Sequence, residues 1–188
     1  MAEPSGEALV FSPPELLAAT HETQAFDCGA KALNQFLQRY ALANQTNGSA
    51  RTFVTAAKGQ VFGYYSLAAA SVEHAAVPAR VSKGLARHPI PMLLLARLAV
   101  DIRAQGQGVG RSLLQSALLK YLQACEVIGC RALMVHAKDE AALRFYEGYG
   151  FEPSPIDSAH LYLLTTDIRK TLGHGVIETW RSTHTRSE

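Results

Sequence analysis

Three consecutive segments decide the fold: LLLARLAVD (residues 93–101), QGQGVG (residues 105–110) and RSLLQSAL (residues 111–118). The first is almost continuously apolar, which predicts a strand buried on both faces. The glycines allow a sharp turn, and the apolar spacing behind them predicts a long helix that reaches Cys125. N–H groups at the positive end of such a helix bind phosphate or pyrophosphate, so the turn is a predicted phosphate site.

Two familiar nucleotide-binding motifs do not fit this turn. No lysine follows the glycines, as GxxxxGK(S/T) requires, and Arg111 stands where GxGxxG has its third glycine. A tight turn without any ligand is the alternative, because glycine-rich turns alone are weak indicators of function.

Helix and strand signals alternate along the rest of the chain. Residues 10–18 predict one strand and a turn, and Asp27 is the expected N-cap of an amphipathic helix that ends near residues 45–48. Further strands are expected over residues 51–57, 61–70, 132–137 and 161–166, with a short helix capped by Asp139 and stopped at Gly150. The fold class is therefore α/β, with a central mixed twisted sheet flanked by helices.

Length and composition favour one folded domain. The 188 residues, 48% of them hydrophobic, suffice for a continuous core. We expect an N-terminal segment (residues 1–23), the folded domain (residues 24–168) and a polar, flexible C-terminal tail (residues 169–188).

The cysteines and the apolar runs indicate a cytoplasmic protein without a membrane segment. Cys28, Cys125 and Cys130 form no CxxC pair and have no histidine at zinc-ligand spacing, so we expect reduced thiols and no metal. The longest apolar run, residues 92–100, is interrupted by Arg97 and is shorter than the roughly 20 residues that span a bilayer. No secretory signal is evident at the N-terminus.

Two motifs resemble those of the GNAT superfamily of acetyltransferases. Gln105-x-x-Gly108-x-Gly110 matches the Q/R-x-x-G-x-G/A acyl-CoA loop, and ALRFYEGYGF (residues 142–151) looks like the A-x-x-F-Y-x-x-x-G-F segment that closes the cofactor site. The resemblance implies acetyl-CoA as co-substrate, with Leu98 and Val100 offering backbone groups to the pantetheine arm. The implied cofactor-binding residues are Leu98, Ala99, Val100, Gln105, Gly106, Gln107, Gly108, Val109, Gly110, Arg111, Ser112 and Phe145.

Tyr146 is the predicted catalytic residue. When an amine attacks the thioester, CoA leaves as a thiolate, and a phenol with a pKa near 10 is able to protonate it. No general base is evident: His136 lies in an apolar strand and is interpreted as a core histidine, while His74, His88 and His160 have no recognisable partner. An α-amine acceptor tolerates this, since its pKa of about 7.7–8.0 leaves a neutral fraction at pH 7.

Several further segments extend the resemblance to the GNAT toxins of bacterial type II toxin–antitoxin pairs. They are FDCGAKALNQFL (26–37), ARTFV (50–54), GYYSLA (63–68), PIPMLLLARLAVD (89–101), IGCRALMVHA (128–137) and RFYEGYGF (144–151). The resemblance implies acetylation of the α-amine of aminoacyl-tRNA, which blocks translation, and neutralisation by a ribbon-helix-helix antitoxin. It also implies that DNA is met only through the antitoxin, and we expect a homodimer.

A local basic cluster is the candidate tRNA surface. It consists of Arg80, Lys83, Arg87 and His88, and such clusters meet phosphates. We expect Arg51, Arg97 and Arg144 near it, and assign Arg51, Arg80, Lys83 and Arg87 to the tRNA surface. A solvated basic loop is the alternative, since the formal net charge is only +2.

Two other functions remain open. One is a GNAT enzyme that acetylates a small amine, such as a polyamine or an antibiotic, or a protein N-terminus. The other is a noncatalytic component of an antitoxin–DNA complex, against which the intact Tyr146 and glycine-rich turn argue.

Overall fold

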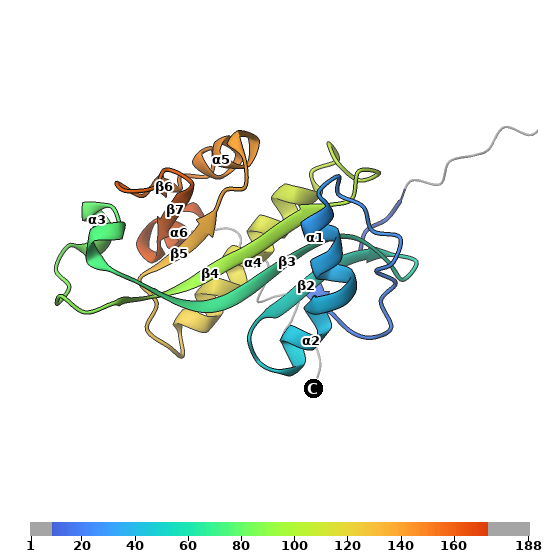
Figure 1. The fold of residues 1–188 in the computed structure, drawn as a ribbon, viewed down its shortest axis with the longest axis horizontal. Helices are drawn as coiled ribbons and strands as arrows, with labels where there is room; N and C mark the ends of the chain where they lie inside the picture. The colour runs from blue at the N-terminus through green and yellow to red at the C-terminus, as the bar shows by residue number, and fades with distance from the viewer. Residues whose placement is uncertain (1–8, 173–188) are drawn as a thin grey trace, which may run out of the picture. The chain divides into compact units, whose positions relative to one another are not determined.

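The computed structural model describes residues 9–172, which form a mixed α/β structure with a seven-stranded sheet (Figure 1). The strands are β1 (Glu15–Leu16), β2 (Arg51–Ala57), β3 (Gln60–Val72), β4 (Ile90–Val100), β5 (Ala132–His136), β6 (Glu152–Pro153) and β7 (His160–Leu164). Their order is β1-β2-β3-β4-β5-β7-β6; β4 and β5 pair in parallel, and β1–β2, β2–β3, β5–β7 and β6–β7 are antiparallel. The predicted fold class is confirmed. The flexibility predicted for residues 173–188 lies outside the described residues.

The chain divides into two compact units, which are described one at a time. Among the described residues, the first comprises residues 9–68 together with Ala96–Ala117, and the second comprises Ala69–Leu95 together with residues 118–172. The division of the sequence into a domain over residues 24–168 with two appendages stays a prediction. Part of the N-terminal appendage nevertheless joins the sheet, because β1 pairs with β2 through Glu15 and Leu16.

In the first unit, one helical segment covers a face of β2 and β3. It consists of α1 (Lys31–Gln35), a π-helical turn η1 (Phe36–Tyr40) and α2 (Ala41–Thr46). The expectation that Asp27 is its N-cap is wrong, because Ala30 holds that position without a side-chain hydrogen bond. Asp27 Oδ1 instead accepts from Gly29 N at 2.8 Å and from Asn34 Nδ2 at 2.7 Å, which closes a tight turn before the helix.

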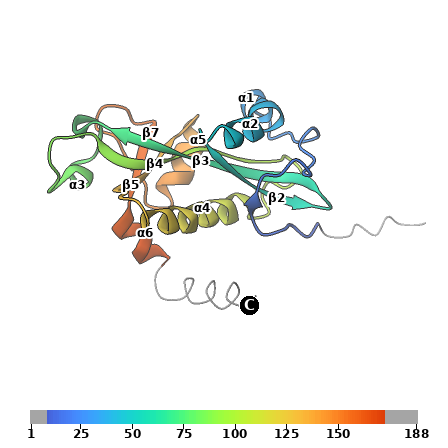
Figure 2. The same cartoon turned by 90° about the horizontal axis from the view of Figure 1, so that it is seen from below.

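The opposite face of β2 and β3 packs against the first turns of α4 (Val109–Cys125), as Figure 2 shows. Successive residues of β3 point to opposite faces. The Tyr64 hydroxyl donates to the Leu33 carbonyl of α1, while the Tyr65 hydroxyl lies 2.8 Å from Ser116 Oγ of α4. At Gly63 a Cβ atom would approach Leu113 Cδ1 to 2.9 Å, so this glycine allows α4 to lie close to the sheet.

The second unit places its own apolar cluster on β5 and β7. Its helices are η2 (His74–Ala76), α3 (Ala79–Ser82), α5 (Glu140–Glu147) and α6 (Thr165–Thr171), together with the end of α4. Val77, Val81, Ile90, Met92, Ala132, Met134 and Tyr162 are buried together. The basic connection over residues 74–91 therefore holds only short elements, as its prolines predict.

The strand predicted over residues 161–166 ends earlier than expected. Thr165 and Thr166 begin α6, and the Thr165 hydroxyl contacts the Tyr121 hydroxyl and the carbonyl of Cys130. The helix continues through the first residues assigned to the tail, and Leu172 behind it is 5% exposed. In the described range, no helix combines the length and apolar character needed to cross a bilayer.

Candidate active site

The glycine-rich turn connects β4 to α4 and has left-handed backbone at two positions. Gly106 and Gly108 have φ angles of 73° and 80°, which favour glycine. A Cβ atom added at either residue would meet no atom within 4 Å, so this side of the turn is open. Gly110 differs, because a Cβ there would make an ordinary 3.7 Å contact with Val100 Cγ2.

The start of α4 offers unpaired N–H groups. The first backbone hydrogen bond into the helix joins Ser112 N to Gly108 O at 3.1 Å. Within residues 9–172, the N–H groups of Val109, Gly110 and Arg111 have no backbone acceptor. A 17-residue helix directs the positive end of its dipole to the same point, so the turn fits a phosphate group.

A buried carboxylate braces the turn. The Asp101 side chain is 0% exposed and accepts from Arg103 Nε and Nη2, each at 2.7 Å, and from Asp27 N at 3.0 Å. Burial raises the pKa of Asp101, but these hydrogen bonds outweigh burial and hold the pKa below its ordinary value. Sequence reasoning did not assign these residues; the one signal is an aspartate placed directly after a buried strand.

The glutamines of the turn hold the backbone in place. Gln105 Nε2 donates to Val100 O at 3.0 Å and to Cys28 O at 3.4 Å, and Gln107 Nε2 donates to Arg103 O at 2.9 Å. Their amide groups are thus engaged with the protein. We therefore expect the backbone of the turn, more than these side chains, to contact a phosphate.

The pairing of β4 with β5 ends halfway along β4. Leu93, Leu94 and Leu95 pair with Leu133, Met134 and Val135, and the register stops there. Leu98, Ala99 and Val100 continue β4 without a β5 partner, which leaves backbone groups on that edge for an extended ligand. This agrees with the role implied for Leu98 and Val100, which remains a prediction.

Tyr146 lies on α5 of the second unit and is 7% exposed. Asp139 caps the helix as expected, accepting from Ala142 N at 2.8 Å. The Tyr146 ring packs edge-on against Phe145 and Phe151, with centroids 5.2 and 5.4 Å away. Burial raises the pKa of Tyr146 to about 12, so the phenol is protonated at neutral pH and remains a hydrogen-bond donor.

The hydroxyl of Tyr146 makes no hydrogen bond with the described residues. In contrast, the hydroxyls of Tyr64, Tyr65 and Tyr121 contact Leu33, Ser116 and Thr165 respectively. In the described part of the chain no fully buried side-chain oxygen lacks a partner, so the Tyr146 hydroxyl reaches accessible space. The O–H group of Tyr146 is thus available to donate a hydrogen bond to a ligand. The hydroxyl of Tyr162 likewise makes no hydrogen bond with the described residues and reaches accessible space.

The interpretation of His136 as a core residue is wrong. It ends β5, where the sheet stops, and its side chain is exposed. Its ring stacks on His160 at 4.0 Å, and His160 Nε2 lies 3.6 Å from Asp157 Oδ2, so His160 does have partners. Burial and the neighbouring His160 lower the pKa of His136, with Asp157 opposing. His74 also has a partner, because its Nε2 lies 2.6 Å from Ala86 O.

The basic segment of the second unit contains one cation that is already neutralised. Arg80 forms ion pairs with Glu152 and, at 2.9 Å, with Asp167. Lys83 and Arg87 are exposed and make no ion pair with the rest of residues 9–172. Phosphate contacts are therefore expected from these two residues before Arg80.

The predicted site residues divide between the units. Leu98, Ala99, Val100, the turn from Gln105 to Ser112, and Arg51 belong to the first unit. Tyr146, Phe145, Arg80, Lys83 and Arg87 belong to the second. Arg144, named with the basic cluster, pairs with Glu140 at 2.6 Å on its own helix.

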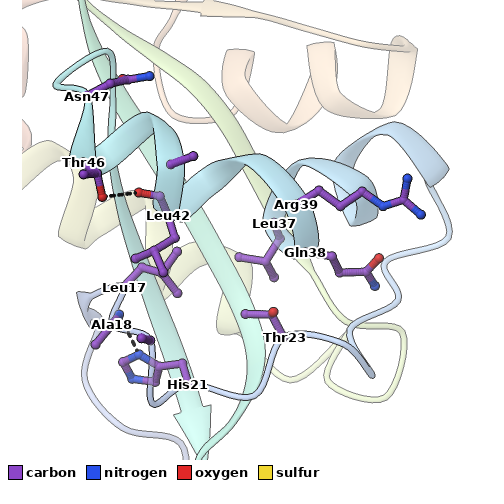
Figure 3. Close-up of a pocket in the computed structure, with 12 residues that line it drawn as sticks. Leu17, Ala18, His21, Thr23, Leu37, Gln38, Arg39, Leu42, Thr46 and Asn47 are labelled. Atoms are coloured by element: carbon purple, nitrogen blue, oxygen red, sulfur yellow. Dashed lines mark hydrogen bonds between the residues drawn. The ribbon is translucent and has the colours of Figure 1, made fainter.

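Hollows lie along the described surface of the first unit, and two of them bear on the site. One, of about 380 Å³, adjoins the turn at Gln107, Gly108, Val109 and Ser112 and is also lined by residues 11–14 and Thr55, a contribution of the N-terminal segment that we did not predict. The other is a groove of about 770 Å³ between residues 17–23 and the helices η1 and α2, where Leu17, Leu37 and Leu42 line the wall (Figure 3). None of the predicted site residues lines the groove.

Each unit has features expected of an acyl-CoA-dependent transferase: the first has a buried strand, a left-handed glycine turn and a helix start, and the second has a buried tyrosine on a short helix. The model of the acetyltransferase (GNAT) domain matches residues 48–153, and the chain belongs to the GNAT acetyltransferase family.

Within this family, the chain is similar to several proteins described as toxins. The chain is 42% identical to a tRNA-acetylating toxin of Mycobacterium tuberculosis (strain H37Rv), over 87% of this chain and 98% of the relative. It is similar to AtaT complexed with acetyl-methionyl-tRNAfMet, with 32% identity, a TM-score of 0.80 and coverage of 87% and 100%. It is also similar to a tyrosine-to-phenylalanine mutant of AtaT bound to the C-terminus of the antitoxin AtaR and acetyl-CoA, with 30% identity, a TM-score of 0.75 and coverage of 87% and 99%.

Proposed function

We propose that this protein transfers the acetyl group of acetyl-CoA to the α-amine of aminoacyl-tRNA and acts as a translation-blocking toxin. The observation that carries the proposal is the 42% identity, over nearly the whole relative, to a tRNA-acetylating toxin. The preserved turn and the available Tyr146 hydroxyl support an active enzyme. Acetylation would remove the nucleophilic amine on which peptide-bond formation depends.

Binding of acetyl-CoA is assigned to the first unit. The N–H groups from Gln107 to Ser112 are proposed to hold the pyrophosphate, and the free edge of Leu98 and Val100 the pantetheine arm. Acetyl-CoA supplies the acetyl thioester when bound. The residues present fit this role, because the turn is open and, within residues 9–172, the N–H groups of Val109, Gly110 and Arg111 have no backbone acceptor.

Tyr146 is proposed to donate a proton to the departing thiolate. A donor whose pKa is raised to about 12 is a weaker acid than free tyrosine, but it stays protonated until the thiolate develops. We assign no histidine of the described residues to the acceptor amine. Solvent is therefore proposed to take the proton from this amine. The low pKa of an α-amine, about 7.7–8.0, makes this sufficient near neutral pH.

The partners follow from the same comparison. Contacts with tRNA are proposed at Lys83 and Arg87 of the second unit and at Arg51 of the first, and Arg80, which is already paired with carboxylates, is proposed as a weaker contact. A ribbon-helix-helix antitoxin is proposed as the neutralising partner, DNA as a partner reached only through that antitoxin, and a homodimer in the cytoplasm as the working form. AtaT bound to the C-terminus of AtaR supports an antitoxin partner in general.

Incubation with radiolabelled acetyl-CoA and a bulk pool of charged tRNA tests the proposal. Label on an aminoacyl adenosine after nuclease digestion is the expected result, with Tyr146→Phe as the matched control that should label far more slowly. Label in polyamines, antibiotics or protein N-termini would support the small-amine alternative. An absence of label in every acceptor, with acetyl-CoA bound, would support the noncatalytic alternative.

A further inference from the structure

Arg97 in β4 is a partly buried cation without a counter-charge. Its side chain makes no ion pair and no hydrogen bond with any residue from 9 to 172. The guanidinium group makes a cation–π contact with the Phe36 ring, whose centroid lies 3.7 Å from Arg97 Cζ. The cation–π contact engages the face of the guanidinium group and leaves its N–H donors unused. These donors are therefore left to solvent or to a ligand.

Two other arginines show how this chain normally satisfies such a group. Arg131 is also partly buried, and it donates to the carbonyl oxygens of Val81, Arg80 and Lys83. Arg103 pairs with the carboxylate of Asp101 at 2.7 Å. Arg97 has neither carbonyl nor carboxylate partners, so the fold itself does not use its donors.

The donors of Arg97 are open to solvent. No fully buried side-chain nitrogen of the described residues lacks a hydrogen-bond partner. Because the Arg97 nitrogens have no partner, they lie in accessible space even though most of the side chain is covered. A guanidinium group in this position is able to present two parallel N–H groups to one oxyanion.

The ring that supports Arg97 is held rigidly. Phe36 is 4% exposed, begins the π-helical turn η1 and stacks on Tyr64 with centroids 6.1 Å apart. Tyr64 is fixed in turn, since its hydroxyl donates to Leu33 O at 2.8 Å. The guanidinium position is therefore set by packing, which lowers the entropy cost of binding a ligand.

Arg97 points to the face of β4 that lies opposite the phosphate-binding turn. Phe36, which Arg97 contacts, belongs to the apolar cluster under α1 and η1. Ala99 lies two residues further along β4, on the same face as Arg97, and belongs to the same cluster. Val100 points the other way and faces Gly110 at the start of α4. A pyrophosphate held by the turn is thus on the other face, so a phosphate that contacts Arg97 would come from another group.

We propose that Arg97 binds a phosphodiester of the single-stranded acceptor end of charged tRNA. The proposal rests on the proposed function, because it takes aminoacyl-tRNA as the acceptor. Arg97 directly precedes Leu98, where the edge expected to hold the pantetheine arm begins, so a phosphate on Arg97 would hold the acceptor end next to the acetyl group. The residue would thus determine substrate position and would take no proton.

Three variants of Arg97 test the proposal in the full-length protein. For Arg97→Ala we expect the Kd for charged tRNA to rise about 10- to 100-fold, the range for one charge-assisted hydrogen-bonded contact. The slope of log affinity against log salt should flatten by about 0.7–0.9, as for one lost phosphate. Arg97→Lys should keep part of the affinity, and Arg97→Gln, which keeps the stem on Phe36, should lose it even if the Ala variant folds poorly.

Arg39→Ala is the matched control, because Arg39 is an exposed cation of the same unit without an ion pair to the described residues. It should change neither affinity nor slope. Wild-type affinity and slope in Arg97→Gln, while the wild type acetylates tRNA, would overturn the role of Arg97 and leave the proposed function intact. Loss of acetyl-CoA affinity instead would place a CoA phosphate on Arg97 and also overturn it. A wild type that labels no aminoacyl-tRNA would overturn the proposed function itself.

Discussion

Replacing Gly108 with valine should separate the geometry of the turn from the stability of the fold. Left-handed backbone costs an L-residue about 1–2 kcal/mol, and the φ angle at Gly108 is 80°. The Cβ atom itself meets no protein atom within 4 Å, so no packing cost is added. For a chain of this length, such a cost lowers Tm by about 2–8 °C, which leaves a folded protein.

The effect on acetyl-CoA should be larger. The strained residue would turn the neighbouring N–H groups from their common point, and losing one charge-assisted hydrogen bond weakens binding about 10- to 100-fold. Calorimetric titration with acetyl-CoA, beside a thermal melt, measures both quantities. Gly110→Ala is the control, because its Cβ would lie in ordinary contact at 3.7 Å and alanine fits the G/A position of the motif. A folded Gly108→Val protein with wild-type affinity would refute the assignment of the turn.

Four further outcomes are expected. Tyr146→Phe should keep acetyl-CoA affinity within a few-fold and lower kcat by about 10- to 10⁴-fold in a steady-state assay of CoA release; an unchanged kcat would reduce Tyr146 to packing. The double variant Lys83→Ala and Arg87→Ala should flatten the salt dependence of tRNA binding by about 1–2 units, and an identical slope would place the tRNA surface elsewhere. Although burial raises the pKa of Asp101, its hydrogen bonds lower it below the ordinary value, so its stabilisation is full above about pH 4 and lost as the pH falls further. The unfolding free energy of Asp101→Asn, measured in urea, should therefore depend less on pH in this range than that of wild type, and equal dependence would contradict the network. Gly63→Ala should lose about 1–3 kcal/mol of unfolding free energy, because its Cβ would come within 2.9 Å of Leu113 Cδ1, and an unchanged urea midpoint would contradict this packing.

The central strand, the turn and the following helix were predictable because their signals are local. The apolar run of β4 and the spacing along α4 are read directly from the chain. Glycines 106 and 108 adopt the positive φ angles that their position in the turn suggested. The Asp139 cap was equally local, since a cap bonds a backbone group only three residues away.

Asp27 and His136 were misjudged because their surroundings come from distant segments. Asp27 has the type of an N-cap, but its backbone N–H is held by Asp101 and its side chain bonds Asn34. His136 follows four buried residues of β5 and shares their apolar pattern. The end of the sheet exposes it, and its partner His160 comes from β7, which no local pattern reveals.

Two arginines, Arg80 and Arg97, also have surroundings that the local sequence does not reveal. Arg80 lies in a run of cations that indicates a phosphate surface, yet Glu152 and Asp167, more than seventy residues away, already neutralise it. Arg97 interrupts an apolar strand and was expected only as a cation near the basic cluster, yet in the structure its donors have no partner among the described residues. The availability of a cation for a phosphate therefore depends on which carboxylates and carbonyls the fold brings to it, more than on the density of charge along the chain. On this argument the tRNA contacts of this protein should be sought at Arg97, Lys83 and Arg87 before Arg80.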